Sequence, residues 1–343
     1  MKDGVPMSAE CNDRTPPVSV IIAVRNEEEC LDHCLESIIS LDYPKDKIEI
    51  ILVDGMSTDK TMSIIESWIK KDDRIRALTN PDRIVSTGMN IGLKESRCDL
   101  ILWTSGHVLL KPDYLRKCLD TMEKTSASAV GGILETVGTT PIGRINAAVL
   151  SNRFGVGGGA HRVGNKSGWV QTVTMALYRK DAIIEAGGWD EALPRSQDND
   201  LHDRMNKIGR RSYMMADVSS IYLCRETFGG LLRQAWQNGY WNIMLTKMGR
   251  RGFNTRHFVP MIFVGCFALL IVGSLFSAPA LCLLISLLML YAVAAIAVSI
   301  SEGIGRRFSW QIPVMPFWFL AFHLSYGFAS WVALFSPTYK PEK

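Results

Sequence analysis

The chain has 343 residues, of which 47% are hydrophobic and 21% are charged. It carries 38 lysines and arginines against 34 aspartates and glutamates, so its net charge is +4. This length supports one or two domains, and so small a net charge excludes a nucleic-acid binder that relies on bulk charge. Charged residues fill the first three quarters of the chain and nearly vanish from the last quarter, which excludes a uniformly soluble globule and a disordered chain.

The N-terminus and the cysteines point to the cytoplasm. Residues 1–17 are polar and lack the apolar stretch of a cleaved signal peptide, so we expect a tail that stays on the cytoplasmic side. The 8 cysteines include no Cys-x-x-Cys pair. Their scattered spacing predicts reduced thiols and no disulfide or zinc framework.

Short apolar runs alternate with helical patterns through the first 125 residues. The expected strands are 18–24, 48–53, 75–78 and 100–103, and the expected helices are 27–39, 58–71, 87–95 and 112–124. This alternation predicts an α/β fold with a doubly wound, mostly parallel sheet. Ligands bind such sheets at the carboxyl ends of the strands, so we expect the chemistry just after Val24, Val53 and Trp103.

Polar residues follow these strands. Arg25, Asn26 and Glu27 come after the first strand, Asp54 after the second, and Ser105-Gly106-His107 after the fourth. No Gly-x-Gly-x-x-Gly follows the first strand and the chain has no P-loop, which disfavours both kinds of nucleotide site. Asp54 has two possible roles, because its carboxylate can accept hydrogen bonds from a base or ribose, or can cap the following turn.

The last quarter of the chain reads as membrane helices. Residues 258–301 contain no Asp, Glu, Lys or Arg. This uncharged run is long enough for two spans of roughly 20 residues, with a break at 277–279. A second uncharged run at 308–339 predicts a third span over about 312–335. We therefore expect about three transmembrane helices in 258–339, preceded by a basic and aromatic linker at 241–257 in the membrane interface.

Basic residues set the expected orientation. Clusters at 247–256 and 306–307 flank the first two spans, and the positive-inside rule places both in the cytoplasm. The catalytic part then faces the cytoplasm from the inner membrane, and the turn at 277–279 lies outside. Three complete spans would put the C-terminus outside. Lys340 and Lys343 argue against that position, so the third helix could instead be re-entrant or interfacial.

Several motifs in order resemble one known family. Residues 18–29 and 53–61, followed by Gly187-Gly188-Trp189-Asp190-Glu191 and Gln197-Asp198-Asn199-Asp200, resemble the inverting family 2 glycosyltransferases of the GT-A fold. Segments 154–158 and 225–241 are similar to an ExoA-like, succinoglycan-synthesising branch with C-terminal membrane spans. The resemblance implies a Rossmann-like GT-A domain over 18–240, followed by an α-helical transmembrane region.

The resemblance also implies roles for single positions. The nucleotide-sugar would be bound by Val24, Arg25, Asn26, Glu27, Asp54, Ser105 and Gly106. Asp198 would be the catalytic base that takes the proton of the acceptor hydroxyl, with Asp200 as the fallback base. Asp200, Arg233, Gln234 and Trp241 would lie at the acceptor or the diphosphate. One carboxylate suffices for inversion, because UDP leaves without an acid of its own.

The sequence departs from the family at two places. Ser105 and His107 stand where the family has its metal-binding Asp-x-Asp, which leaves three alternatives: His107 binds Mn²⁺ or Mg²⁺ with help from the diphosphate, protonated His107 stabilises the diphosphate directly, or the protein is not an active transferase. Gln197 replaces the usual Glu but leaves the Asp198 carboxylate in place.

These expectations combine into one function and one alternative. We expect a membrane-bound hexosyltransferase that moves a sugar, with glucose favoured, from a UDP-sugar to a lipid-linked saccharide acceptor in surface or exopolysaccharide synthesis. Its partners would be the donor, the acceptor and the lipid bilayer, with no nucleic acid. The alternative is a catalytically degenerate scaffold or subunit.

Overall fold

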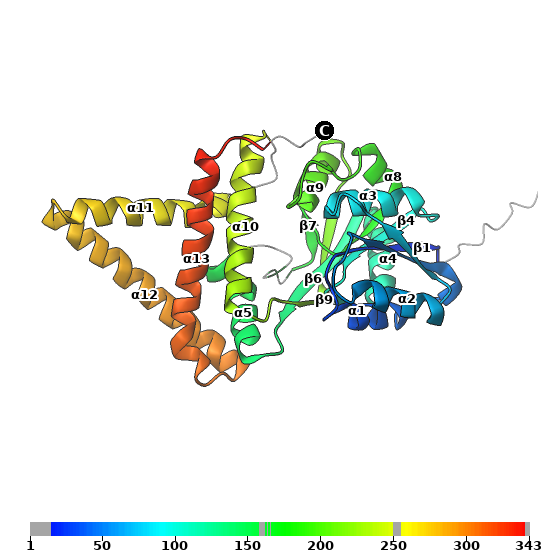
Figure 1. The fold of residues 1–343 in the computed structure, drawn as a ribbon, viewed down its shortest axis with the longest axis horizontal. Coiled ribbons are helices and arrows are strands. Elements are labelled where there is room, and N and C mark those ends of the chain that lie inside the picture. Colours follow the sequence, from blue (N-terminus) through cyan, green and yellow to red (C-terminus); the bar gives the residue numbers. More distant parts are fainter. Residues whose placement is uncertain (1–14, 158–161, 163, 165, 250–254, 340–343) are drawn as a thin grey trace, which may run out of the picture.

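The computed structural model describes residues 15–157, 162, 164, 166–249 and 255–339. Most of the polar tail at 1–17, part of the linker at 241–257 and the residues after 339 therefore lie outside the described residues. The described part divides into an α/β body and a group of long helices beside it (Figure 1).

The body is built on a single curled sheet. Its strands are β1 (Val18–Val24), β2 (Ile48–Asp54), β3 (Ile75–Thr79), β4 (Leu100–Ser105), β5 (Val108–Leu110), β6 (Ala129–Val137), β7 (Gly168–Val170), β8 (Leu177–Arg179) and β9 (Ser212–Leu223). They run in the order β3-β2-β1-β4-β8-β6-β9-β5, with β7 paired to β9. The first four strands are parallel, and the antiparallel β8 joins them to the parallel pair of β6 and β9.

Helices cover both faces of this sheet. They are α1 (Leu31–Ile39), α2 (Thr61–Lys71), α3 (Val85–Glu95), α4 (Tyr114–Thr125), α5 (Pro141–Ser151), α6 (Arg153–Val156), α8 (Lys180–Glu185) and α9 (Gln197–Lys207). Alternate residues of a strand point to opposite faces. In β1, Val20 and Ile22 pack in the hydrophobic cluster with α1 and α4, whereas Ile21 packs in the cluster with α3, α8 and α9.

The four expected parallel strands and the four helices between and after them are all present, and the mostly parallel α/β fold is confirmed. The first helix begins at Leu31, not at residue 27. Asn26 has a left-handed backbone with φ of 54°, and its side chain accepts a hydrogen bond from the Thr58 backbone N at 2.8 Å. Glu27 N likewise donates to Thr61 Oγ1 at 2.8 Å. These bonds hold residues 26–27 as a loop against the turn after β2, which delays the helix.

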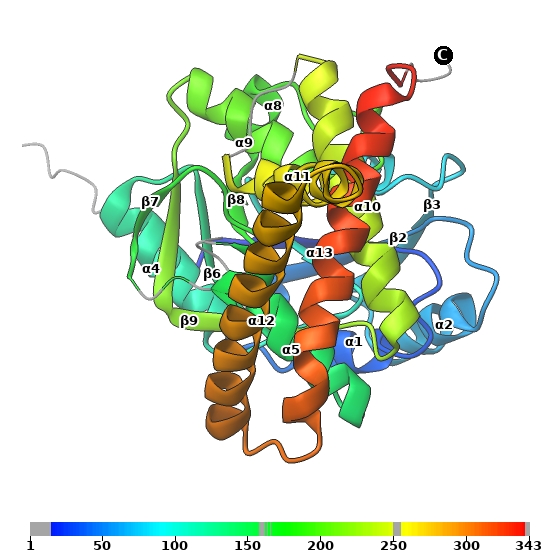
Figure 2. The ribbon, with the colours of Figure 1, turned by 90° about the vertical axis from the view of Figure 1, so that its left-hand side faces the viewer.

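Four long helices follow the body: α10 (Phe228–Lys247), α11 (Val259–Ser274), α12 (Ala278–Arg306) and α13 (Gln311–Phe335). α10 and α13 lie side by side, while α11 and α12 form a V that points away from the body (Figures 1 and 2). Three helical segments are long and apolar enough to cross a membrane: Thr255–Ser274, α12 and α13. The expected division at residue 240 falls inside α10, and the domain boundaries stay a prediction.

Candidate active site

A cavity of about 920 Å³ opens where the parallel strands end. Its walls come from the ends of β1 and β4, from the start of α9, from the end of β9 and from one side of α10. The expected site residues that line it are Val24, Arg25, Glu27, Ser105, His107, Asp198, Arg233 and Gln234. The fold thus brings together segments that lie more than 200 residues apart in the sequence, from Val24 to Arg233.

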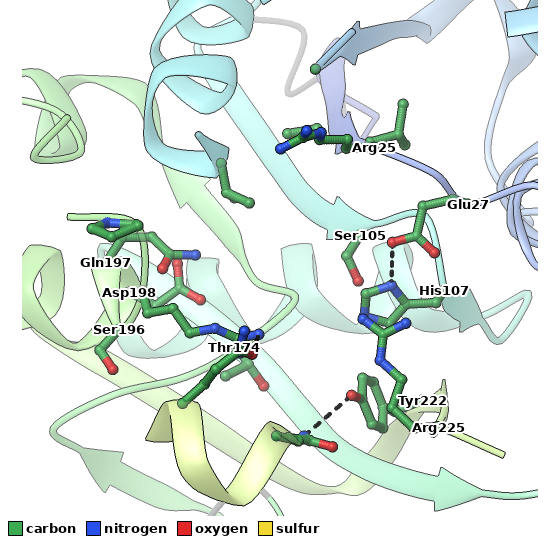
Figure 3. A pocket seen from close by; sticks show the side chains of 18 of the residues that line it. Arg25, Glu27, Ser105, His107, Thr174, Ser196, Gln197, Asp198, Tyr222 and Arg225 are labelled. Carbon is green, nitrogen blue, oxygen red and sulfur yellow. Dashed lines mark hydrogen bonds and ion pairs between the residues drawn. The ribbon is translucent and has the colours of Figure 1, made fainter. Parts of the chain in front are cut away.

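Glu27 and His107 form a pair on one side of this cavity. The Nδ1 atom of His107 lies 2.8 Å from the Glu27 carboxylate, and the ring of Tyr222 packs edge-on against the imidazole at 5.2 Å between ring centres. Gly106, between β4 and His107, permits this approach, since a Cβ there would lie 3.0 Å from Val24 and 3.1 Å from Glu27. Figure 3 shows Arg225 beside this pair.

Asp198 faces the cavity from its opposite side (Figure 3). It is the second residue of α9, and Ser196, the residue just before that helix, has a left-handed φ of 59°. Asp198 Oδ1 is buried and has no hydrogen-bond partner among the described residues. Burial raises the pKa of the Asp198 carboxyl to about 6, and the side chain of Trp189 partly opposes this shift. A carboxylate with a raised pKa is a stronger base, so this oxygen is suited to accept a proton near neutral pH.

Six arginines also line the cavity, and we call them the pocket arginines: Arg25, Arg83, Arg162, Arg195, Arg225 and Arg233. Within the described part of the chain, no ion pair joins any of the six to a carboxylate. Arg162 donates to Thr136 Oγ1 at 2.9 Å and Arg195 donates to Gln237 Oε1. Guanidinium groups held without acidic partners in a cavity fit an anionic ligand with several oxygens, such as a diphosphate.

The cavity offers few ligands for a metal ion. Among the described residues, no group of three or more His, Cys, Asp and Glu side chains is placed to hold one. Glu27 and His107 supply at most two donors, and Ser105 Oγ beside them is buried without a partner. Mn²⁺ and Mg²⁺ require more oxygen ligands than this. The residues therefore fit a divalent ion only if a bound diphosphate completes its coordination.

Other expected site residues have structural partners. The Asp54 carboxylate accepts from the Ser57 backbone N at 3.1 Å and from Ser57 Oγ at 2.6 Å, which is the turn-capping arrangement. Asn26 bridges to that same turn, and neither residue is part of the cavity lining, although Val53 and Gly55 are. Their role in nucleotide binding stays a prediction.

The structure separates the fallback base and one aromatic residue from the cavity. Asp200 is buried and its carboxylate lies 2.8 Å from Arg204 one turn along α9, so it is held by an ion pair. Trp241 packs edge-on against Tyr240 and Tyr339 and is not part of the lining. Asp198 is thus the carboxylate of α9 that faces the cavity.

Of the pocket arginines, the expected site included only Arg25 and Arg233, and it missed Arg83, Arg162, Arg195 and Arg225. Arg195 stands three residues before Asp198, and that spacing was the signal available for it. Arg83 has a left-handed φ of 62° in the loop before α3, and nothing in the sequence pattern singles it out. Of the glycine-rich stretch 155–159, the first two residues end α6, and residues 158–161 lie outside the described residues.

Comparison with known proteins identifies a family for one domain of the chain. Residues 19–187 match the family described as Glycosyl transferase family 2. The chain contains a family 2 glycosyltransferase domain. This match confirms the expected resemblance and supports a glycosyltransferase as the kind of enzyme.

Two curated relatives show how far the similarity extends beyond this domain. It is 28% identical over 208 residues to the succinoglycan biosynthesis protein ExoA of Rhizobium meliloti, which covers 60% of this chain and 63% of ExoA. The chain therefore matches less than two thirds of ExoA's length. It is 26% identical over 333 residues to a dolichyl N-acetyl-α-D-glucosaminyl phosphate 3-β-D-2,3-diacetamido-2,3-dideoxy-β-D-glucuronosyltransferase of Methanococcus voltae, covering 94% of this chain and 99% of the relative.

Solved structures agree on the fold. A mannosyltransferase of Pyrobaculum calidifontis, in complex with GDP-Man and Mn²⁺, superposes with a TM-score of 0.60 at 18% identity over 94% of this chain and 88% of its own. TarS of S. aureus, residues 1–349 in complex with UDP-GlcNAc, superposes with a TM-score of 0.52 at 15% identity over 92% and 90%. At these identities the likeness confirms the GT-A-like fold of the family 2 domain and nothing about its ligands.

Proposed function

We propose that this chain is a membrane-bound inverting glycosyltransferase that transfers a hexose, with glucose favoured, from a UDP-sugar to a lipid-linked saccharide at the cytoplasmic face of the inner membrane. The product would enter a surface glycan or exopolysaccharide. The relative from M. voltae, whose name specifies a dolichyl-linked sugar phosphate, and ExoA, named for succinoglycan biosynthesis, support this acceptor class and this product class. The three apolar helices support a membrane location.

One observation carries the proposal: across one cavity, a buried carboxylate oxygen of Asp198 faces guanidinium groups, and among the described residues the oxygen has no hydrogen-bond partner and the guanidinium groups have no acidic partner. Glycosyl transfer from a nucleoside diphosphate sugar needs both features. The base must take a proton from the acceptor, and cations must stabilise the charge that develops on the departing diphosphate. A protein that serves only as a scaffold gains nothing from a buried ionisable group, which lowers the stability of the fold when it is charged. The retained Asp198 therefore favours the enzyme.

In this proposal, each substrate has its own place in the cavity. The nucleoside would lie at the ends of β1 and β2, where Val24, Arg25 and Gly55 line the cavity, and its diphosphate would extend towards Arg225. The acceptor hydroxyl would approach from the side of Asp198, near α10. Asp198 accepts its proton as the hydroxyl oxygen bonds to the anomeric carbon, the bond from that carbon to the diphosphate oxygen breaks, and UDP leaves with the bonding electrons. Attack from the face opposite the leaving group inverts the anomeric centre.

Glu27 and His107 would hold a divalent ion together with the diphosphate. Such an ion, when bound, supplies positive charge to the phosphate oxygens. The pocket arginines serve the same end from the protein, and they bind and orient the diphosphate directly. Sugar transfer to the acceptor then depends on this set of cations and on Asp198.

The test is transfer of labelled sugar from UDP-glucose into extracted lipid by membranes that contain the protein, with Mn²⁺, with Mg²⁺ and with EDTA. We expect labelled lipid with UDP-glucose or another UDP-sugar. If transfer survives EDTA, the arginines alone neutralise the diphosphate. If no member of a UDP-sugar panel labels the lipid, the proposed donor class is wrong and the scaffold alternative takes its place.

A further inference from the structure

The last helix, α13, is docked along its whole length on the catalytic body and on α10. Its hydrogen bonds reach three elements: Trp318 Nε1 to Asn146 Oδ1 of α5 at 3.0 Å, His323 Nε2 to the Gly155 carbonyl of α6 at 3.2 Å, and Ser325 Oγ and Ser330 Oγ to the Leu232 and Gly239 carbonyls of α10 at 2.9 and 3.1 Å. The contact with α10 is close, since a Cβ on Gly239 would lie 2.1 Å from the Tyr326 carbonyl oxygen. The helix is therefore a fixed part of the body.

This docking conflicts with a membrane-spanning α13. α10 lies beside it (Figure 1), crosses it at an angle (Figure 2), and lines the active-site cavity with its other side, through Arg233, Gln234, Gln237 and Asn238. If α13 crossed the bilayer, α10 and α5 would lie at the same depth. Arg233 and the polar cavity would then sit in hydrocarbon, where charged and unpaired polar groups are strongly disfavoured. An α13 that lies along the membrane surface avoids this cost.

The outer side of α13 fits that position. Phe317, Phe328 and Phe335 are 58, 57 and 79% exposed. Their spacings of 11 and 7 residues place them on one side of the helix, opposite its buried residues, and at the edge of this side Phe317 stacks on Phe228 of α10 at 5.7 Å between ring centres. Trp236 of α10 is also exposed, and its ring lies 5.9 Å from that of Phe328. A stripe of aromatic side chains is typical of a helix at the level of the lipid headgroups.

The V of α11 and α12, which we call the hairpin, begins and ends at the body. At its start, His257 Nδ1 lies 3.2 Å from Asn242 Nδ2 of α10. At its end, Glu302 accepts from Asn152 Nδ2 at 2.8 Å, and Arg144 donates to the Arg306 carbonyl at 3.2 Å. Both ends therefore lie on the same side of the membrane as the body, and the tip points away from it (Figure 1).

The first helix of the hairpin is shorter than the bilayer is thick, whereas the second, α12, has 29 residues and is long enough to cross it. α11 has 16 residues, which corresponds to about 24 Å, whereas the hydrocarbon core measures about 30 Å. Its tip carries Leu275 and Phe276, which are 75 and 84% exposed, and no charged residue occurs between 258 and 301. The tip therefore carries no charged side chain that would hold it in water on the far side.

We propose that the C-terminal region is a one-sided membrane anchor. The hairpin dips into the bilayer and its tip stays in hydrocarbon, while α13 lies in the headgroup layer of the near leaflet, between lipid and the body. The last described residue agrees, because Tyr339 packs against Trp241 of α10 and so lies on the side of the body. This inference concerns the anchor and holds whichever sugar is transferred. In this arrangement no helix spans the bilayer completely, and the hairpin enters it from the cytoplasmic side. The turn at 277–279 and the C-terminus are then not outside, contrary to the expectation from three full spans.

Nitroxide depth measurements test the position of α13. Phe317, Phe328 and Phe335 are each replaced by Cys and spin-labelled, in a chain whose other accessible thiols are replaced by Ser and which is reconstituted in vesicles of phosphatidylethanolamine and phosphatidylglycerol. The relative accessibility to oxygen and to a nickel chelate then reports depth. We expect the three labels at one shallow depth. A spanning helix would separate the first and last labels by about 27 Å along the membrane normal, since positions 317 and 335 are 18 helical steps apart, and that result would overturn the proposal.

Two controls complete the experiment. Ile184→Cys, an exposed apolar position of α8 on the body, should report an aqueous label. Phe276→Cys at the hairpin tip should report the deepest label and should not react with a membrane-impermeant maleimide supplied from the opposite side. Rapid reaction there would show that the tip emerges. In sealed vesicles with Ile184→Cys accessible outside, added protease should also remove an epitope tag placed after Lys343, and a protected tag would contradict the one-sided anchor.

Discussion

Replacing Asp198 with Asn removes a buried negative charge and preserves the shape of the side chain. Burial raises the pKa of this carboxyl from 3.8 to about 6. Each pKa unit corresponds to about 1.36 kcal/mol, so ionised Asp198 costs the folded state about 3 kcal/mol above pH 6. This figure is a ceiling, because the residue as a whole is only half-buried. Asp198→Asn should therefore raise the melting temperature by up to about 6–12 °C while it abolishes transfer.

The pH dependence of this effect follows from the sign of the shift. Because the folded-state pKa is the higher one, the protonated carboxyl favours the folded state, and that stability is present below pH 4 and lost as the pH rises through 6. The amide that replaces the carboxyl in the variant carries no charge at any pH. The difference in melting temperature between variant and wild type should be near zero below pH 4, grow between pH 4 and 6, and stay constant above.

The assay is thermal unfolding of the detergent-solubilised protein, followed by tryptophan fluorescence at several pH values. Asp203→Asn is the matched control, since Asp203 lies on the same helix but pairs with Lys207 at 2.6 Å outside the cavity. That variant should show no gain in stability. If Asp198→Asn melts at or below the wild-type temperature at pH 7.5, the carboxylate is not desolvated and the reasoning fails.

Three further predictions concern the pH profile, the pocket arginines and the packing of α13. The kcat/KM for transfer should fall about tenfold per pH unit below the Asp198 pKa of about 6, and a flat profile down to pH 5 would exclude this group as the base. Arg225→Ala should weaken UDP binding, measured by calorimetry, by roughly tenfold or more, because a charge-assisted hydrogen bond is lost. The control Arg116→Ala, which removes a surface ion pair with Asp42, should leave UDP binding unchanged. If both variants bind UDP equally well, Arg225 is not part of the diphosphate site. Gly239→Ala should lower the free energy of unfolding by about 1–3 kcal/mol, because its Cβ has no room against α13, and an unchanged denaturation midpoint would show that α10 and α13 are not tightly docked.

The first half of the fold could be predicted from the sequence because its signals are local. A buried parallel strand is a short apolar run, and Val18–Val24 and Ile48–Asp54 show it plainly. The strands of the second half gave no such signal. β8 has 3 residues and takes its place only through pairing with β4 and β6. β9 runs parallel to β6 through a register shift near Gly131, and the apolar pattern does not encode that irregularity.

The site was predictable where it follows a strand end or a family motif, as for Glu27, His107 and Asp198. Long-range placement decided the rest. By its spacing of 7 residues, Trp241 lies on the same side of α10 as Gln234, but two turns further along the helix it has passed the cavity and packs against Tyr339. Composition likewise predicted that α13 is apolar. Only its docking on α10 shows that one side of it is covered by protein.

The central claim is that Asp198 is the base of a glycosyl transfer at this cavity. Its most direct test compares sugar transfer by wild type, Asp198→Asn and Asp203→Asn at saturating donor and acceptor, after each variant is shown to be folded by its melting curve. We predict that Asp198→Asn lowers kcat by about 10²–10⁴-fold, and that Asp203→Asn retains wild-type turnover. Transfer by a folded Asp198→Asn protein at the wild-type rate would contradict the account.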